Sequence, residues 1–137
     1  MKKIATDLEQ SRKLAEFLLI ESADMFYFRQ IDDDYFPPNV ISIVPTPIII
    51  SDDKKPNYNY DIPAWSLSAL MNAIPNRVEY EFKTYFFKLE TDVYSSGEKY
   101  YDLGYQSAYG WLEYEDSTEL VDACVNLIIK LHERELI

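Results

Sequence analysis

The sequence YDLGYQSAYGW, residues 101–111, decides the predicted fold. Large and small side chains alternate along it with a period of two, which is typical of a β-strand with one buried face. The large members of the pattern are Tyr101, Leu103, Tyr105, Tyr109 and Trp111, and the small or polar members are Asp102, Gly104, Gln106, Ala108 and Gly110. We expect the aromatic side to be buried under helices and the other side to be exposed.

A second long β stretch precedes this one, at residues 78–89. It is also aromatic and alternating, but Tyr85, Phe87 and Leu89 crowd its second face, so either both faces are covered or a bulge exchanges them. The turn-forming sequence SSGE, residues 95–98, separates the two stretches. The pattern therefore predicts an antiparallel hairpin.

Shorter strands are predicted in the first half of the chain. Residues 25–29, 40–44 and 48–50 are rich in β-branched and aromatic side chains and are bounded by turn residues. Pro45 and Pro47 separate the last two, and they break a strand or confine it to a sheet edge because proline has no amide donor.

Two helices are also predicted in this part of the chain. The sequence TDLE has the spacing of a capping box with Thr6 as N-cap, which predicts a helix over about residues 7–19. Residues 61–75 predict a second helix, because Pro63 suits its first turn and Pro75 forbids its continuation.

A third helix is predicted at the C-terminus, where the apolar seam is most continuous. Asp116 is placed as its N-cap and Glu119 at its third helical position. The seam consists of Leu120, Cys124, Leu127, Ile128 and Leu131.

Together these elements predict an α+β fold. One antiparallel sheet of about four to five strands carries three helices, which pack mainly on one face. We expect residues 1–137 to form a single domain, because this length is usual for one domain and the sequence contains neither a linker nor an internal repeat.

Charge and composition restrict the environment and the partners. The chain has 24 acidic and 13 basic residues and a formal net charge of −11. The basic residues are scattered, so repulsion from phosphates argues against direct binding of nucleic acid. No apolar run approaches the length that spans a bilayer, and no export signal is visible. A single cysteine cannot form an internal disulfide, which favours the cytoplasm.

The chain is poor in the side chains that most enzymes use. It has one histidine and one cysteine, and the glycine-rich phosphate and nucleophile motifs are absent. Cys124 and His132 would lie about 12 Å apart along one helix, at roughly 1.5 Å per residue, which separates a nucleophile from its base. We predict a buried structural thiol, no catalytic residue, no cofactor and no metal site. A small hydrolase with paired carboxylates stays open, because distant acids can converge in a fold.

Tyrosine, present 12 times, supplies large contact surfaces with polar tips. The sequence therefore favours a non-catalytic accessory or protein-interaction function. A different protein, or a second copy in a homodimer, would approach the small-residue side of the hairpin, at Gly104, Gln106, Ala108 and Gly110. The acidity also allows an alternative, a nucleic-acid mimic that inhibits a DNA-binding enzyme.

Three segments of the chain resemble a family of small proteins from prophages and mobile elements of gut anaerobic bacteria. These segments are KIATDLEQS at residues 3–11, IPAWSLSAL at residues 62–70 and ELVDACVNLIIKLHE at residues 119–133. The resemblance implies an α+β domain of mobile-element origin. It implies no particular activity, ligand or partner, since none is established for the family.

Overall fold

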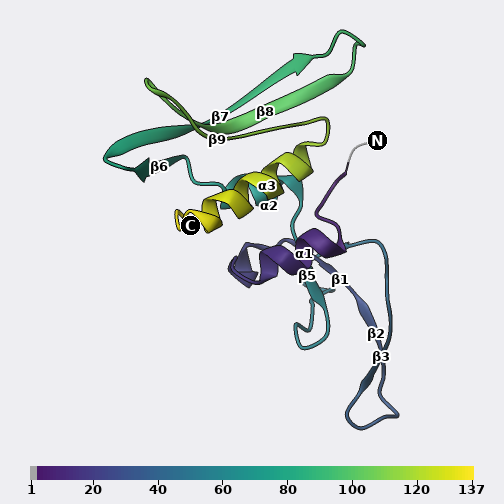
Figure 1. Cartoon of the computed structure of the whole chain (residues 1–137). Helices are drawn as coiled ribbons and strands as arrows, with labels where there is room; N and C mark the ends of the chain where they lie inside the picture. The colour runs from purple at the N-terminus through teal and green to yellow at the C-terminus, as the bar shows by residue number, and fades with distance from the viewer. Residues whose placement is uncertain (1–2) are drawn as a thin grey trace. The chain divides into compact units, whose positions relative to one another are not determined.

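The computed structural model describes residues 3–137, which form two compact units (Figure 1). The N-terminal unit comprises residues 5–69, and the C-terminal unit comprises residues 70–137 together with Lys3 and Ile4. The single domain expected from the sequence stays a prediction, because a division into compact units does not establish whether they unfold together.

The N-terminal unit contains one α-helix and two small antiparallel sheets. Its elements are α1 (Leu8–Ala15), the 3₁₀ turn η1 (Ile20–Ser22), β1 (Met25–Tyr27), β2 (Arg29–Asp32), β3 (Asn39–Ile43), β4 (Ile48–Ile49) and β5 (Ile62–Ala64). One sheet has the order β4-β1-β5, and β2 and β3 form the other. The strands predicted at residues 25–29, 40–44 and 48–50 are present, although the first is divided at Phe28.

Helix α1 begins after Asp7, one residue later than the predicted N-cap Thr6. The Asp7 carboxylate accepts from the Gln10 amide (2.8 Å), and the Gln10 side-chain oxygen accepts from the Asp7 amide (3.1 Å). Thr6 is fully buried, and its hydroxyl lies 2.7 Å from that of Ser11. The helix ends at Ala15, earlier than predicted.

The helix predicted over residues 61–75 is wrong in its first turn, which is strand β5. The Asp61 carboxylate accepts from the backbone amides of Asn57 (2.8 Å) and Arg29 (2.9 Å), and these bonds hold the start of β5 beside the end of β1. Pro63 is tolerated there because β5 is an edge strand of its sheet.

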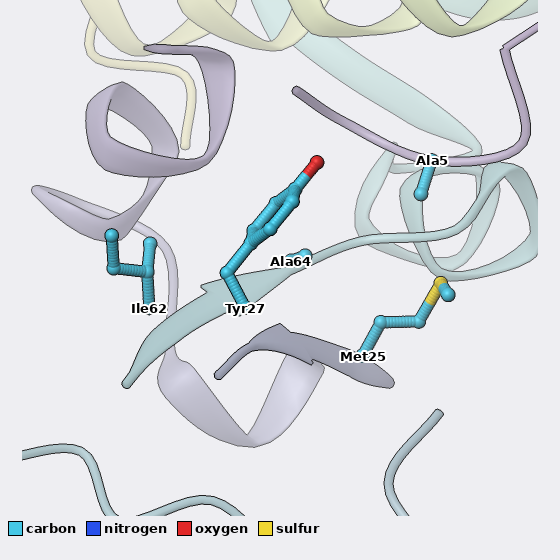
Figure 2. Packing of buried hydrophobic residues seen from close by; sticks show 5 residues of the cluster. All are labelled: Ala5, Met25, Tyr27, Ile62 and Ala64. Carbon is cyan, nitrogen blue, oxygen red and sulfur yellow. The ribbon is translucent and has the colours of Figure 1, made fainter. Parts of the chain in front are cut away.

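Side chains of β1 and β5, together with Ala5, form a small apolar cluster in the N-terminal unit (Figure 2). It consists of the buried residues Ala5, Met25, Tyr27, Ile62 and Ala64. The Tyr27 hydroxyl donates to the carbonyl oxygen of Thr6 (2.7 Å), so its polar atom is satisfied inside the cluster. Each buried Ile or Met side chain contributes about 1.5–3 kcal/mol relative to an exposed one.

The C-terminal unit is a four-stranded antiparallel meander with one long helix. Its elements are β6 (Arg77–Tyr80), β7 (Lys83–Val93), β8 (Lys99–Ser107), β9 (Gly110–Ser117) and α3 (Leu120–Glu133), and α2 (Leu67–Ala73) belongs in part to each unit. The strands pair in the order β6-β7-β8-β9, and α3 packs against β8 and β9 (Figure 1). As predicted, α2 ends before Pro75. Of the predicted α3 seam, Cys124, Leu127, Ile128 and Leu131 are buried, whereas Leu120 is only partly buried.

The α+β class with three α-helices is confirmed, but the single sheet of four to five strands is wrong. The described strands form three antiparallel sheets of three, two and four strands. The helices are accordingly not gathered on one face of one sheet: α1 contacts β5, and α3 contacts β8 and β9. In two of these sheets, β2–β3 and β6–β9, each strand pairs with its neighbour in the sequence.

Two predicted boundaries in the C-terminal unit are also wrong. The stretch at residues 78–89 is two strands, because Glu81 and Phe82 have φ angles of 49° and 65° and form the two-residue turn of a hairpin. Asp116 belongs to β9, and the N-cap of α3 is Glu119.

Strand β8 has an inner face toward α3 and an opposite, outer face. Leu103 and Tyr105 are fully buried on the inner face, as predicted. Tyr109 and Trp111 were expected on the same face, but they are 80% and 40% exposed. The chain reverses in the β8–β9 turn, and the register places Trp111 opposite Gln106, on the outer face.

Candidate functional site

The candidate site is the outer side of the C-terminal sheet, where side chains of β7, β8 and β9 form rows across the three strands. The antiparallel register defines these rows. The first row is Phe86, Gln106 and Trp111, the second is Lys88, Gly104 and Tyr114, and the third is Glu90, Asp102 and Asp116. We call these nine residues the outer face.

Trp111 and Tyr114 form an aromatic pair on the outer face. Their ring centroids lie 5.2 Å apart and their planes meet at 70°, which is an edge-to-face arrangement. Trp111 is 40% exposed, Tyr114 is 42% exposed, and Phe86 in the first row is 56% exposed. Exposed aromatic side chains gathered on one surface are typical of contact sites for other molecules.

Gly104 allows β8 and β9 to approach closely beneath this pair. A Cβ atom at this position would lie 2.2 Å from the carbonyl oxygen of Glu113 and 3.1 Å from Cε3 of Trp111. The register shifts between Gly104 and Gln106, and Glu113 has a φ angle of 67°, so β9 carries a bulge here. The bulge explains why Trp111 and Tyr114, an odd number of residues apart, both face outward.

Ion pairs tie the bulge to the end of α3. Arg134 contacts the Glu113 carboxylate, and Lys130 contacts the Glu115 carboxylate. The Lys130 ammonium also donates to the carbonyl oxygen of Tyr114 (3.4 Å). The hydrogen bond to Glu115 is the largest of the effects that raise the pKa of Lys130. We infer that α3 positions the part of β9 that carries Tyr114.

The third row of the outer face brings together three carboxylates. Glu90, Asp102 and Asp116 occupy directly opposed positions on neighbouring strands, where like charges destabilise a sheet. Two contacts offset this repulsion: the Tyr114 hydroxyl donates to Asp102 (2.6 Å), and the Lys88 ammonium lies 3.2 Å from Glu90. The hydrogen bond to Asp102, followed by burial and by the charges of Asp102 and Asp116, raises the pKa of Tyr114 to about 12. Within residues 3–137, no cation lies within 4.0 Å of the Asp116 carboxylate.

A second aromatic pair follows the acidic row. The rings of Tyr94 and Tyr100 stack with their centroids 4.2 Å apart. The pKa of Tyr100 is raised, first by burial and then by the charges of Asp92 and Asp102. Aromatic side chains thus lie on both sides of the acidic row, with Trp111 and Tyr114 before it and Tyr94 and Tyr100 after it.

The four residues predicted as an interaction surface are divided between the outer face and its end. Gly104 belongs to the outer face but is buried by the backbone of its own chain, and Gln106 lies between Phe86 and Trp111. Ala108 is exposed in the β8–β9 turn, and Gly110 begins β9 with a φ angle of 124°. Interaction with another chain through these residues stays a prediction.

Alternation alone did not reveal the aromatic residues of the outer face. A strict period of two assigns Trp111 and Tyr114 to opposite sides of a strand. They share one side because Glu113, a residue that rarely adopts a positive φ, forms the bulge. The crowding on both faces of residues 78–89 reflects the β6–β7 hairpin turn at Glu81 and Phe82, so it did not mark the bulge in β9.

The thiol and the imidazole considered for catalysis lie on α3. Cys124 is fully buried, as predicted, and burial raises the pKa of its thiol to about 12. Its sulfur lies 3.8 Å from the sulfur of Met71. A protonated and enclosed thiol is a poor nucleophile. His132, farther along α3, is exposed to solvent. In the described part of the chain, no group of three His, Cys, Asp or Glu side chains could hold a metal ion.

Comparisons of this chain with family models, curated proteins and solved structures found no match. The resemblance to prophage and mobile-element proteins therefore stays a prediction. Among residues 3–137, no helix is both long enough and apolar enough to cross a membrane.

Proposed function

We propose that the chain is a non-catalytic protein-interaction module that binds a basic segment of a partner protein through the outer face. The observation that carries this proposal is the row of Glu90, Asp102 and Asp116 beside the exposed rings of Trp111 and Tyr114.

A cationic partner relieves the repulsion within the acidic row. A Lys or Arg side chain placed between Asp102 and Asp116 interacts with two carboxylates at once, and Asp116 has no cation of its own among the described residues. An arginine can in addition stack on the face of an aromatic ring. Charge complementarity of this kind selects partners and speeds their association.

The aromatic rings provide the apolar part of the contact. Truncation of a central Trp or Tyr commonly costs an interface more than about 1 kcal/mol. Trp111 and Tyr114 already pack against each other, and the bulge and Gly104 fix their positions before a partner arrives. Binding therefore loses less side-chain freedom than it would with mobile rings.

Random-peptide display on the immobilised chain tests the proposal. We expect enrichment of peptides that combine Arg or Lys with an aromatic or aliphatic side chain. In calorimetry, Trp111→Ala and the double variant Asp102→Asn with Asp116→Asn should each bind a selected peptide about tenfold more weakly. The matched controls are Phe36→Ala, a fully exposed aromatic residue in the N-terminal unit, and Glu98→Gln in the exposed β7–β8 turn.

Two results contradict the proposal. One is enrichment of acidic or purely apolar peptides, because neither fits the acidic row. The other is an equal loss of affinity in the control variants, which would place the binding surface elsewhere.

The acidic row also favours a second candidate function, an acidic mimic of nucleic acid. Here the partner's basic segment is itself a nucleic-acid-binding cleft, which Glu90, Asp102 and Asp116 occupy in place of phosphates. Duplex DNA distinguishes the candidates once a partner is known. A mimic is displaced from its partner by DNA, whereas a module that binds another surface forms a ternary complex.

A further inference from the structure

A polar hollow lies in the N-terminal unit, between the start of β2 and the loop that precedes β5. Its volume is about 310 Å³. Two cations, Arg29 and Lys55, line it together with Tyr60, and Phe28 and Ile31 give it an apolar wall. We call it the Arg29 hollow. Its size is that of a site for a small molecule.

The guanidinium of Arg29 is incompletely satisfied by the protein. Its Nε atom is buried without a hydrogen-bond partner and is the one such side-chain atom in the described part of the chain. Buried polar atoms are nearly always paired, because leaving one unpaired is costly. Within residues 3–137, its two terminal amino groups have no acceptor either, and they are not enclosed. Arg29 therefore presents two unused donors where it lines the hollow.

The carboxylates that line the hollow do not neutralise its cations. Asp61 is buried, and its two oxygens accept from the backbone amides of Arg29 (2.9 Å) and Asn57 (2.8 Å). Asp33 is exposed. Among the described residues, no carboxylate lies within 4.0 Å of the side-chain nitrogens of Arg29 or Lys55. An anion that enters the hollow thus meets donors that the protein itself has left unused.

We propose that the Arg29 hollow binds the carboxylate group of a small organic molecule. The paired amino groups of a guanidinium match the two oxygens of a carboxylate in a bidentate contact. The Lys55 ammonium adds attraction, and the apolar wall contacts the rest of the molecule. A singly charged carboxylate is preferred to a phosphate, because Asp33 and Asp61 also line the hollow and repel a second negative charge.

Nitrogen NMR of the arginine guanidinium groups in the full chain tests the proposal. Benzoate, acetate and inorganic phosphate serve as probes. We expect benzoate to shift the Arg29 signal saturably and to bind more tightly than acetate, because its ring contacts the apolar wall. Arg29→Lys keeps the charge but loses the fork and should weaken binding about tenfold.

Neighbouring lysines provide a matched pair of variants. Lys55→Gln should weaken benzoate binding, whereas Lys54→Gln should not, because Lys54 does not line the Arg29 hollow. Asp33→Asn should strengthen binding by removing a negative charge. Circular dichroism shows whether Arg29→Lys folds. If it does not, the expected gain of affinity in Asp33→Asn still tests the proposal.

Three outcomes overturn the inference. The absence of a saturable shift with any probe removes the hollow as an anion site. Tighter binding of phosphate than of benzoate removes the carboxylate assignment. An equal effect of Lys54→Gln and Lys55→Gln on benzoate affinity would mean that the anion responds to the overall charge of this region and not to the Arg29 hollow. None of these outcomes bears on the outer face, which belongs to the other unit.

Discussion

Replacing Gly104 with alanine should destabilise the C-terminal unit through one backbone contact. The new methyl group would lie 2.2 Å from the carbonyl oxygen of Glu113. Contacts between a carbon and a carbonyl oxygen ordinarily fall at about 3.3–3.6 Å, so one strand must move by about 1 Å. Overpacking costs about 1–3 kcal/mol. Because a backbone oxygen cannot rotate away, we expect a loss of about 3 kcal/mol in the free energy of unfolding.

Chemical denaturation of Gly104→Ala beside Gly97→Ala measures this effect. Gly97 lies in a turn with a φ of 90°, and a methyl group added there would meet no other atom within 4 Å. Its replacement is therefore opposed only by backbone conformation, at about 1–2 kcal/mol. Gly104→Ala should also displace the indole of Trp111, which lies 3.1 Å from the new methyl group. The indole N–H resonance of Trp111 in an NMR spectrum should therefore shift in this variant only.

A cost for Gly104→Ala no greater than that for Gly97→Ala would refute the reasoning. It would mean that the β9 bulge can move at little cost, and that the close approach of β8 and β9 does not fix the structure of the outer face. A large loss of stability with an unmoved Trp111 signal would support the claim about strand packing and contradict the claim about the position of Trp111. The strands would then be tightly packed, but the aromatic pair would not depend on Gly104.

Three further predictions concern stability. Folding raises the pKa of Tyr114 from about 10 to about 12. The contribution of this shift to the free energy of unfolding is complete below pH 10 and is lost as the pH rises toward 12. Tyr114→Phe should therefore flatten the alkaline part of the plot of stability against pH, and an unchanged plot would contradict this. Arg29→Met should raise the free energy of unfolding by about 1 kcal/mol in denaturant, because it removes a buried unpaired donor; a loss would show that the guanidinium is stabilising. Trp65 and Trp111 lie in different units, and quenching-resolved fluorescence should give coincident unfolding midpoints if residues 1–137 form one domain.

Elements marked by local chemistry could be predicted from the sequence. The seam that ends at Leu131 predicted α3, Pro75 predicted the end of α2, and alternation predicted burial of Leu103 and Tyr105. In each case the residues that decide the structure are close together in the sequence. Periodicity and proline are sufficient signals under that condition.

Elements decided by partners distant in sequence could not be predicted. Residues 62–64 form a strand because the Asp61 carboxylate bonds to the amide of Arg29, on another strand. Gly104 and Gln106 of the candidate site were predicted, but its aromatic pair was missed for the same kind of reason, since the rows combine three strands and depend on the bulge at Glu113. Nothing in the sequence marked Arg29 either, because its unusual feature is a missing partner.

The contact that confines Gly104 is made by the main chain, and this has an evolutionary consequence. A clash with a side chain can be relieved by a compensating substitution, but every amino acid brings the same carbonyl group to the position of Glu113. Descendants that keep the bulge should therefore retain glycine at position 104, while the residues of the neighbouring rows change as the partner changes. An alignment of such descendants would show a single invariant position within a variable surface.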